Sequence, residues 1–294
     1  MPQMDTPRIL LVGRVGQVGY ELRRTLAPMA DITSVDFPDI DLTQPDSIRH
    51  WVRETRPHVV INAAAYTAVD KAETDEATAA KINGTAPGIL AEEAARLGAW
   101  IVHYSTDYIF DGTKRTPYVE TDAPNPLGAY GRTKLAGDLA VQAANPRHLI
   151  FRLCWVYGAR GGNFMLTMMR LARERDRLRV VNDQSGCPTW SRMIGQATTA
   201  ALAKSLTATD SHTAGTYHLA ASGSTTWHGF AQSILDQMPT AEKKCAVAEP
   251  IPSSEYPTPA QRPAYSVLDC EKLSRTFGLK LPDWHTSLLQ VLEK

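Results

Sequence analysis

The chain has no long apolar run, little cysteine and no excess of charge of one sign. Its apolar run from Ile9 to Val12 is too short for a signal peptide or a membrane span. The four cysteines are scattered, which excludes a dense disulfide framework and a Cys-rich zinc site and fits a reducing cytosol. Because 31 basic residues balance 31 acidic ones, we expect neither a nucleic-acid surface nor a membrane-binding patch. These absences favour a cytoplasmic enzyme, monomeric or homodimeric, that acts on a small molecule.

Short apolar runs alternate with amphipathic stretches through the first half of the chain. The runs that predict strands are residues 8–12, 31–35, 58–61, 100–104 and 148–151. The stretches with helical spacing are residues 17–28, 45–55, 75–97 and 130–144. Nearly continuous apolar strands are typical of a parallel sheet that is covered on both faces. The repeated strand–helix–strand order predicts an α/β fold with a Rossmann-type doubly wound parallel sheet.

The alternation loosens beyond about Gly158, and turn residues increase. We therefore expect a dinucleotide-binding domain over residues 1–160 and a smaller substrate domain over residues 161–294, with the chain crossing back to the sheet. Helical spacing recurs at residues 163–175, 193–205 and 226–237, and residues 215–219 predict a short strand. The proline-rich segment 250–263 is either a linker or a wall of the substrate site.

A glycine-rich loop follows the first predicted strand. Glycines at positions 13, 16 and 19 allow a tight turn and a close approach of the backbone to a pyrophosphate. The helix that follows offers free N–H groups and a positive dipole end to the same anion. The alternative is a purely structural turn, but the strand before and the helix after are the context that a dinucleotide site requires.

Two charged residues bear on the choice of coenzyme. Asp36 ends the second strand, where a carboxylate accepts hydrogen bonds from a ribose 2′-hydroxyl and so favours NADH. Arg14 follows the first glycine and could pair with the 2′-phosphate of NADPH. Asp41 and Leu42 are expected near the adenine. The sequence leaves both NADPH and NADH open as the coenzyme.

Tyr130 and Lys134 lie four residues apart, so on a helix they project from one face. A neighbouring cation lowers the pKa of a phenol and makes it a better proton shuttle. Thr106 should end the fourth strand, on the ligand side of the sheet, where its hydroxyl can donate to a carbonyl oxygen. Each feature alone is equally consistent with an ordinary helix face or strand end, and their combination favours a catalytic site.

The order of these motifs resembles that of extended short-chain dehydrogenases/reductases. Several segments resemble, more narrowly, the dTDP-4-dehydrorhamnose reductase family, and the likeness runs nearly from end to end. These segments are residues 62–73, 103–110, 130–137, 182–189 and 256–263. The resemblance implies reduction of a sugar nucleotide, dTDP-4-dehydro-L-rhamnose, at its C4 keto group, in a pathway to cell-surface polysaccharide.

The resemblance also implies roles for individual residues. Tyr130 would donate the proton, Lys134 would hold the nicotinamide ribose and lower the Tyr130 pKa, and Thr106 would tune that acid. Coenzyme contacts would come from Gly13, Arg14, Gly16, Gln17, Val18, Asp36, Asp41, Leu42, Ala63, Ala64, Ala65, Tyr66, Thr67, Tyr104, Tyr130 and Lys134. Substrate contacts would come from Thr106, Asp107, Trp155, Asn163 and Arg262, of which Arg262 would neutralise the diphosphate and Trp155 could equally be core packing.

Some members of the family are dimers linked by Mg²⁺ through acidic residues. Here the corresponding segment 190–196 has no carboxylate and carries Arg192, and Glu21 is the surviving acidic partner. Because arginine repels a cation, we expect no metal site and no metal-bridged dimer.

Two other functions share these motifs. An epimerase or dehydratase of sugar nucleotides uses the same Tyr/Lys pair, but a dehydratase would carry further acidic groups beside Thr106, and no Glu follows Asp107. A regulatory subunit that binds coenzyme without turnover would not need the complete Thr106, Tyr130 and Lys134 set.

Overall fold

The computed structural model describes residues 6–208 and 212–293, and its centre is a six-stranded parallel sheet. The strand order is β10-β5-β4-β3-β1-β2, the doubly wound arrangement that the sequence predicts. The strands are β1 (Arg8–Val12), β2 (Asp31–Val35), β3 (Val59–Asn62), β4 (Trp100–Thr106), β5 (His148–Leu153) and β10 (Gly215–His218).

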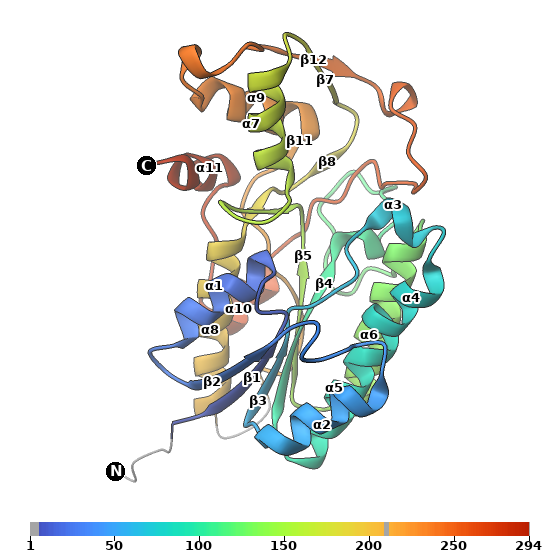
Figure 1. The fold of residues 1–294 in the computed structure, drawn as a ribbon, viewed down its shortest axis with the longest axis vertical. Helices are drawn as coiled ribbons and strands as arrows, with labels where there is room; N and C mark the ends of the chain where they lie inside the picture. The colour runs from blue at the N-terminus through green and yellow to red at the C-terminus, as the bar shows by residue number, and fades with distance from the viewer. Residues whose placement is uncertain (1–5, 209–211, 294) are drawn as a thin grey trace.

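Helices cover both faces of this sheet (Figure 1). Alternate residues of β1 explain why, because Ile9 and Leu11 pack into one apolar cluster and Leu10 and Val12 into another. The first cluster is closed by α1 (Gln17–Leu26), α8 (Ser191–Thr207) and α10 (Glu271–Phe277). The second is closed by α2 (Pro45–Thr55), α5 (Ala86–Arg96) and α6 (Ala129–Ala144). The central strands are therefore buried on both faces, whereas the edge strand β2 stays partly exposed.

The second half of the chain contributes to the sheet layer as well as to the upper part of the molecule (Figure 1). Strand β10 pairs in parallel with β5, and α8 packs on α1. The upper part has its own apolar cluster, formed mainly by α7 (Phe164–Glu174), α9 (Trp227–Gln237) and α11 (Trp284–Leu292). Its short strand pairs are β7 (Leu178–Val181) with β12 (Ala248–Ile251), β8 (Ser185–Gly186) with β11 (Thr225–Thr226), and β6 (Val156–Tyr157) with β9 (Thr189–Trp190).

Several predicted elements differ in detail from the observed ones. The single helix expected over residues 75–97 is divided into α4 (Glu76–Ala80), the π-helical turn η1 (Lys81–Thr85) and α5. Short elements without a clear sequence pattern also occur, namely α3 (Val69–Ala72), η2 (Asp107–Ile109), η3 (Thr240–Glu242) and η4 (Ser253–Glu255). Within the described residues, no helix combines the length and apolar character that crossing a membrane requires.

Candidate active site

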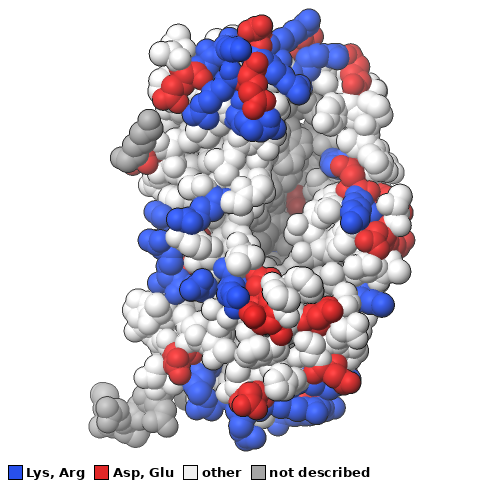
Figure 2. Space-filling view, viewed as in Figure 1, with Lys and Arg blue, Asp and Glu red and all other residues white. Residues whose placement is uncertain are grey.

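A cavity of about 730 Å³ lies at the carboxyl ends of the sheet strands. Its walls come from the β1–α1 loop, the ends of β3, β4 and β5, and α6, with Trp227 of α9 contributed by the upper part. Figure 2 shows the molecule hollowed between its upper and lower parts, with mostly uncharged side chains lining the hollow and charged ones on the surface around it. Parallel sheets bind ligands at this edge, so the cavity occupies the expected position.

The glycine-rich loop forms one end of this cavity. Gly13 has φ of 93°, and a Cβ atom there would lie 2.6 Å from the Ala64 nitrogen. A Cβ atom on Gly19 would overlap the Gly13 carbonyl oxygen, so only glycine permits this turn. Helix α1 begins after Gly16 with no side-chain cap and no acidic residue in its first turn. Its free N–H groups therefore face the cavity, and the loop fits the pyrophosphate of a dinucleotide.

Asp36 and Arg14, which are expected to favour NADH and NADPH respectively, have different surroundings. The Asp36 carboxylate lines the cavity and accepts hydrogen bonds from the Val15 nitrogen at 3.0 Å and the Phe37 nitrogen at 2.9 Å. The Arg14 guanidinium donates to Asp39 at 2.5 Å and to the Ser34 carbonyl at 2.9 Å. The carboxylate is thus available to a ribose, whereas the arginine is already paired.

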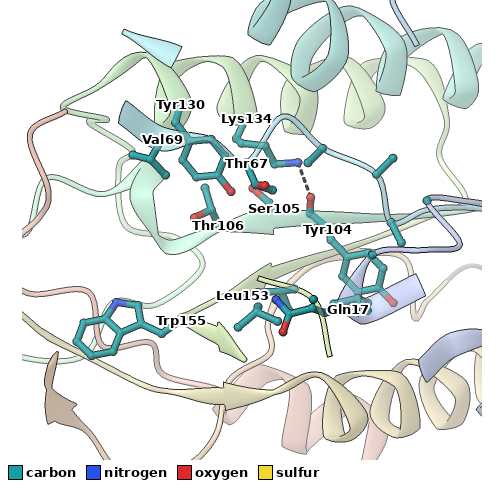
Figure 3. Close-up of a pocket in the computed structure, with 18 of the residues that line it drawn as sticks. Gln17, Thr67, Val69, Tyr104, Ser105, Thr106, Tyr130, Lys134, Leu153 and Trp155 are labelled. Atoms are coloured by element: carbon teal, nitrogen blue, oxygen red, sulfur yellow. Dashed lines mark hydrogen bonds between the residues drawn. The ribbon is translucent and has the colours of Figure 1, made fainter. Parts of the chain in front are cut away.

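Tyr130, Lys134 and Thr106 come together at the centre of the cavity wall. Figure 3 shows the Tyr130 hydroxyl directed toward the strand end that carries Thr106. Lys134 is 1% exposed, and its Nζ donates to the Tyr104 carbonyl at 2.5 Å and lies 3.3 Å from His103 Nε2. The helix and strand ends that the sequence predicts thus bring the three groups together.

Burial controls the protonation of this cluster. It raises the pKa of Tyr130 to about 12, against the lowering effect of the neighbouring Thr106 hydroxyl. The prediction that the Tyr130 pKa would be lowered is wrong for this structure, because desolvation of the phenolate outweighs other influences. Burial likewise lowers the pKa of Lys134 to about 8. A protonated phenol at neutral pH is the state that a proton donor requires.

Asp107 adjoins this cluster as a buried carboxyl group. Its Oδ1 accepts from the Thr106 hydroxyl at 3.1 Å, and its Oδ2 accepts from the Cys154 thiol at 3.1 Å. Desolvation raises the pKa of Asp107 to about 6, above its usual range. The group lies at the cavity wall, so it can meet a substrate as a partly protonated acid.

Trp155 and Trp227 form the wall opposite Tyr130. Their rings stack at 3.5 Å with an interplanar angle of 7°, and both line the cavity. Trp155 adopts a left-handed φ of 44°, and Gly186 leaves room for its indole, since a Cβ there would lie 2.5 Å from the ring. Two stacked indoles offer a flat apolar surface of the kind that sugar and base rings pack against.

The remaining residues expected at the site lie outside this cavity lining. Asp41 accepts two hydrogen bonds from Thr43, Leu42 packs on the core, and the Tyr66 hydroxyl donates to Asp75. Asn163 caps α7, and its Nδ2 donates to Gln17 Oε1 at 3.0 Å, which places it behind the cavity lining.

Arg262 lines a neighbouring cavity of about 620 Å³ instead. Its guanidinium forms a two-point pair with Asp70 at 2.8 and 3.0 Å. Tyr256 and Thr258 of the proline-rich segment line the same cavity, and Trp227 lines both this cavity and the first. Part of that segment is therefore the wall of a cavity.

The acidic residue expected to survive from a metal site has a cationic neighbour. Arg192 Nε lies 3.6 Å from Glu21 Oε2. Across residues 6–208 and 212–293, no group of three or more His, Cys, Asp or Glu side chains is placed to hold a metal ion.

Sequence reasoning missed several residues that line the main cavity. They are Val15, Val69, Ser105, Tyr108, Leu153, Val156, Gly161, Gly162 and Trp227. Ser105 and Tyr108 adjoin a predicted residue and Gly161-Gly162 is a visible turn signal, so these could have been found. Trp227 lies about 70 residues beyond Trp155 and has no local signal, because only tertiary packing brings α9 to the site.

The sheet, the glycine loop and the Thr106, Tyr130 and Lys134 cluster together define a Rossmann-type oxidoreductase of the short-chain dehydrogenase/reductase class. The family model described as the RmlD substrate binding domain matches residues 7–294. A dTDP-4-dehydrorhamnose reductase of Burkholderia thailandensis is 47% identical, with 94% of this chain and 95% of that protein covered. One of Salmonella typhimurium is 46% identical, with 97% of this chain and 96% of that protein covered.

Solved structures agree with this assignment. A dTDP-4-dehydrorhamnose reductase from Clostridium acetobutylicum has a TM-score of 0.90 at 38% identity, covering 97% of this chain and 98% of that one. One from Bacillus anthracis, in complex with NADP, has a TM-score of 0.88 at 34% identity with the same coverage. The chain therefore belongs to the family of dTDP-4-dehydrorhamnose reductases, which confirms the resemblance of its motifs.

Proposed function

We propose that the chain reduces the C4 keto group of dTDP-4-dehydro-L-rhamnose to the alcohol of dTDP-L-rhamnose, with Tyr130 as the proton donor. The observation that carries the proposal is the position of the Tyr130 phenol. Its hydroxyl is directed toward Thr106 and faces a cavity that begins at the glycine loop. The names and complexes of the relatives support the substrate and the coenzyme.

The residues that would hold a coenzyme follow the cavity from end to end. Gly13, Gly16, Gln17 and Val18 would bind the pyrophosphate of NADPH or NADH, and Asp36 the adenosine ribose. The bound nicotinamide supplies the hydride. Ala63, Ala64, Ala65, Thr67 and Tyr104 also line the cavity and would fix the path of the coenzyme between these two ends.

The chain's own chemistry is alignment and delivery of one proton. Thr106 would hold the substrate carbonyl oxygen beside the Tyr130 hydroxyl. As negative charge develops on that oxygen, the phenol donates its proton and becomes a phenolate, which solvent later reprotonates. The buried Lys134 ammonium favours this transient phenolate. The atoms balance: one hydride to carbon and one proton to oxygen give the alcohol.

The sugar nucleotide would extend from this centre toward the upper part of the molecule. Trp155 and Trp227 would pack against its rings, and Arg262, in the adjoining cavity, would meet its diphosphate. For that contact Arg262 would share its charge between the ligand and Asp70.

The test follows absorbance of NADPH and NADH in separate runs with enzymatically generated dTDP-4-dehydro-L-rhamnose. We expect one coenzyme oxidised for each keto sugar consumed. An epimerase would convert the sugar without net oxidation of coenzyme, and a regulatory subunit would bind coenzyme without turnover. Either result contradicts the proposal.

Coenzyme choice can be tested at the ion pair between Arg14 and Asp39. We expect Asp39→Asn to free the Arg14 guanidinium for a 2′-phosphate and to raise the NADPH to NADH ratio of kcat/KM about 2- to 5-fold, the size of one exposed ion pair. The matched control is Asp46→Asn, which removes a surface pair with Arg49 away from the cavity and should leave the ratio unchanged. An unchanged ratio in Asp39→Asn would mean that Arg14 does not contact the 2′-phosphate of NADPH.

A further inference from the structure

Behind Lys134 lies a buried polar cluster that the proposed mechanism does not use. Its central member is Asp138, which is four residues beyond Lys134 and therefore on the same face of α6. Asp138 and His103 are 0% exposed, and Arg152 of β5 is 5% exposed. A fully buried carboxylate between β4, β5 and α6 needs a physical reason, because removing a charge from water is costly.

Contacts within this cluster lead from Asp138 to Lys134. Asp138 Oδ2 accepts from the Ser105 hydroxyl at 2.8 Å and lies 3.6 Å from Arg152 Nε. Asp138 Oδ1 lies 3.8 Å from His103 Nε2, the nitrogen that is 3.3 Å from Lys134 Nζ. Oδ1 has no hydrogen-bond partner among the described residues. One carboxylate oxygen is thus held in place by Ser105, and the other faces the His103 ring on the Lys134 side.

The Asp138 carboxylate lies between two buried cationic side chains. Without it, the interior would hold the Lys134 ammonium and the Arg152 guanidinium with no anion between them. Burial disfavours the charged form of Lys134, and Asp138 is the group whose field opposes that effect. Burial and the Lys134 charge lower the pKa of His103 well below its usual value, so the intervening imidazole stays neutral.

We propose that Asp138 is a positioning residue for the reduction: its carboxylate keeps Lys134 charged and directed at the active site through the neutral ring of His103. This inference rests on the proposed function, in which the ammonium favours the transient Tyr130 phenolate. Burial raises the pKa of Asp138, and the positive charges of Lys134 and of Arg152, on the far side, oppose that effect. The ionisable groups around Lys134 are His103 from β4, Tyr130 and Asp138 from its own helix, Arg152 from β5 and Asp107 from η2.

The test neutralises the carboxylate with Asp138→Asn and reads the Lys134 ammonium directly. In protein labelled with [ε-¹³C]lysine, the Lys134 signal is assigned as the one absent from Lys134→Met, and its pH titration gives the pKa. Removing the influence that raises the pKa of Lys134 should lower it further, by about one unit. The alkaline limb of kcat/KM should move to lower pH by the same amount. A folded Asp138→Asn protein with an unchanged Lys134 pKa overturns the inference.

Three further variants separate charge from structure. Asp138→Glu keeps the charge and should restore the Lys134 pKa, and a Glu variant that behaves like Asn would assign the effect to shape and overturn the inference. Asp138→Ser is a smaller neutral variant for use if Asp138→Asn does not fold.

The matched control, Glu93→Gln, neutralises another buried carboxylate, 2% exposed and paired with Arg53 across α2 and α5. It should lower stability without moving the Lys134 pKa, and an equal shift there would show a global effect.

The two readouts keep the two hypotheses apart. The NMR titration needs no substrate, so it tests Asp138 even if the chain does not turn over the keto sugar. Conversely, turnover of the keto sugar with no change of the Lys134 pKa in Asp138→Asn contradicts only the role of Asp138.

Discussion

Replacing Tyr130 with phenylalanine is expected to lower kcat for the keto sugar by about 10²- to 10⁴-fold, the usual contribution of a positioned general acid. The substitution removes the hydroxyl group, which carries the proton to be transferred, and keeps the packing of the ring. Coenzyme affinity, measured by quenching of protein fluorescence, should stay within about two-fold. The reason is that the hydroxyl acts on the transition state and adds little to binding of the coenzyme in the ground state. The measurement is steady-state reduction at saturating coenzyme.

A matched control removes a phenol hydroxyl elsewhere. Tyr157 is 1% exposed and does not line the cavity, and its hydroxyl has no hydrogen-bond partner within residues 6–208 and 212–293. Tyr157→Phe should therefore retain normal turnover and equal or greater stability, because an unsatisfied buried hydroxyl is costly. Near-normal reduction by Tyr130→Phe would falsify the proposed role of the phenol.

Gly19→Ala should raise the dissociation constant for coenzyme about 100-fold, equivalent to about 2.7 kcal/mol of binding free energy. Its Cβ would overlap the Gly13 carbonyl oxygen, which is backbone and cannot rotate away. The loop must open to admit the methyl group, so its N–H groups no longer converge on the pyrophosphate. Fluorescence titration with NADH and NADPH measures the effect.

The control for this prediction is Gly84→Ala. Gly84 is also buried and helical, but a Cβ there would make ordinary contacts, the nearest being 3.5 Å from the Ala136 Cβ. We expect unchanged coenzyme affinity and slightly higher stability, since alanine is the better helix former. Equal losses in both variants would mean that the glycine loop has no special part in coenzyme binding.

The strands and helices of the sheet layer were predictable because their signals are local. β1, β2 and α2 occupy the expected residues, and β4 ends at Thr106 as expected. Alternating apolar positions fix which side chains face each helix layer, and this requires only the sequence. The break in the helix over residues 75–97 was missed because a π-helical turn keeps nearly helical spacing, so the pattern barely changes.

At the site, the sequence predicted that Thr106, Tyr130 and Lys134 lie together but not what surrounds them. Spacing placed Tyr130 and Lys134 on one face of α6, which the structure confirms. The direction of the Tyr130 pKa shift was wrong, because desolvation depends on how completely β4, η2 and α6 enclose the phenol. The burial of Asp138 has no signal in the sequence, since a carboxylate in a helix is usually exposed.

The sequence by itself determined the doubly wound sheet, the glycine loop and the Thr106, Tyr130 and Lys134 set, because each depends on contacts between near neighbours in the chain. Only the tertiary structure decided what surrounds them. It brings Trp227 against Trp155 and pairs Arg14 with Asp39 and Arg262 with Asp70. It also encloses Lys134 between His103 and Asp138. Burial and ion pairing depend on residues that are far apart in the chain. Together they set the protonation states of the residues at the candidate active site.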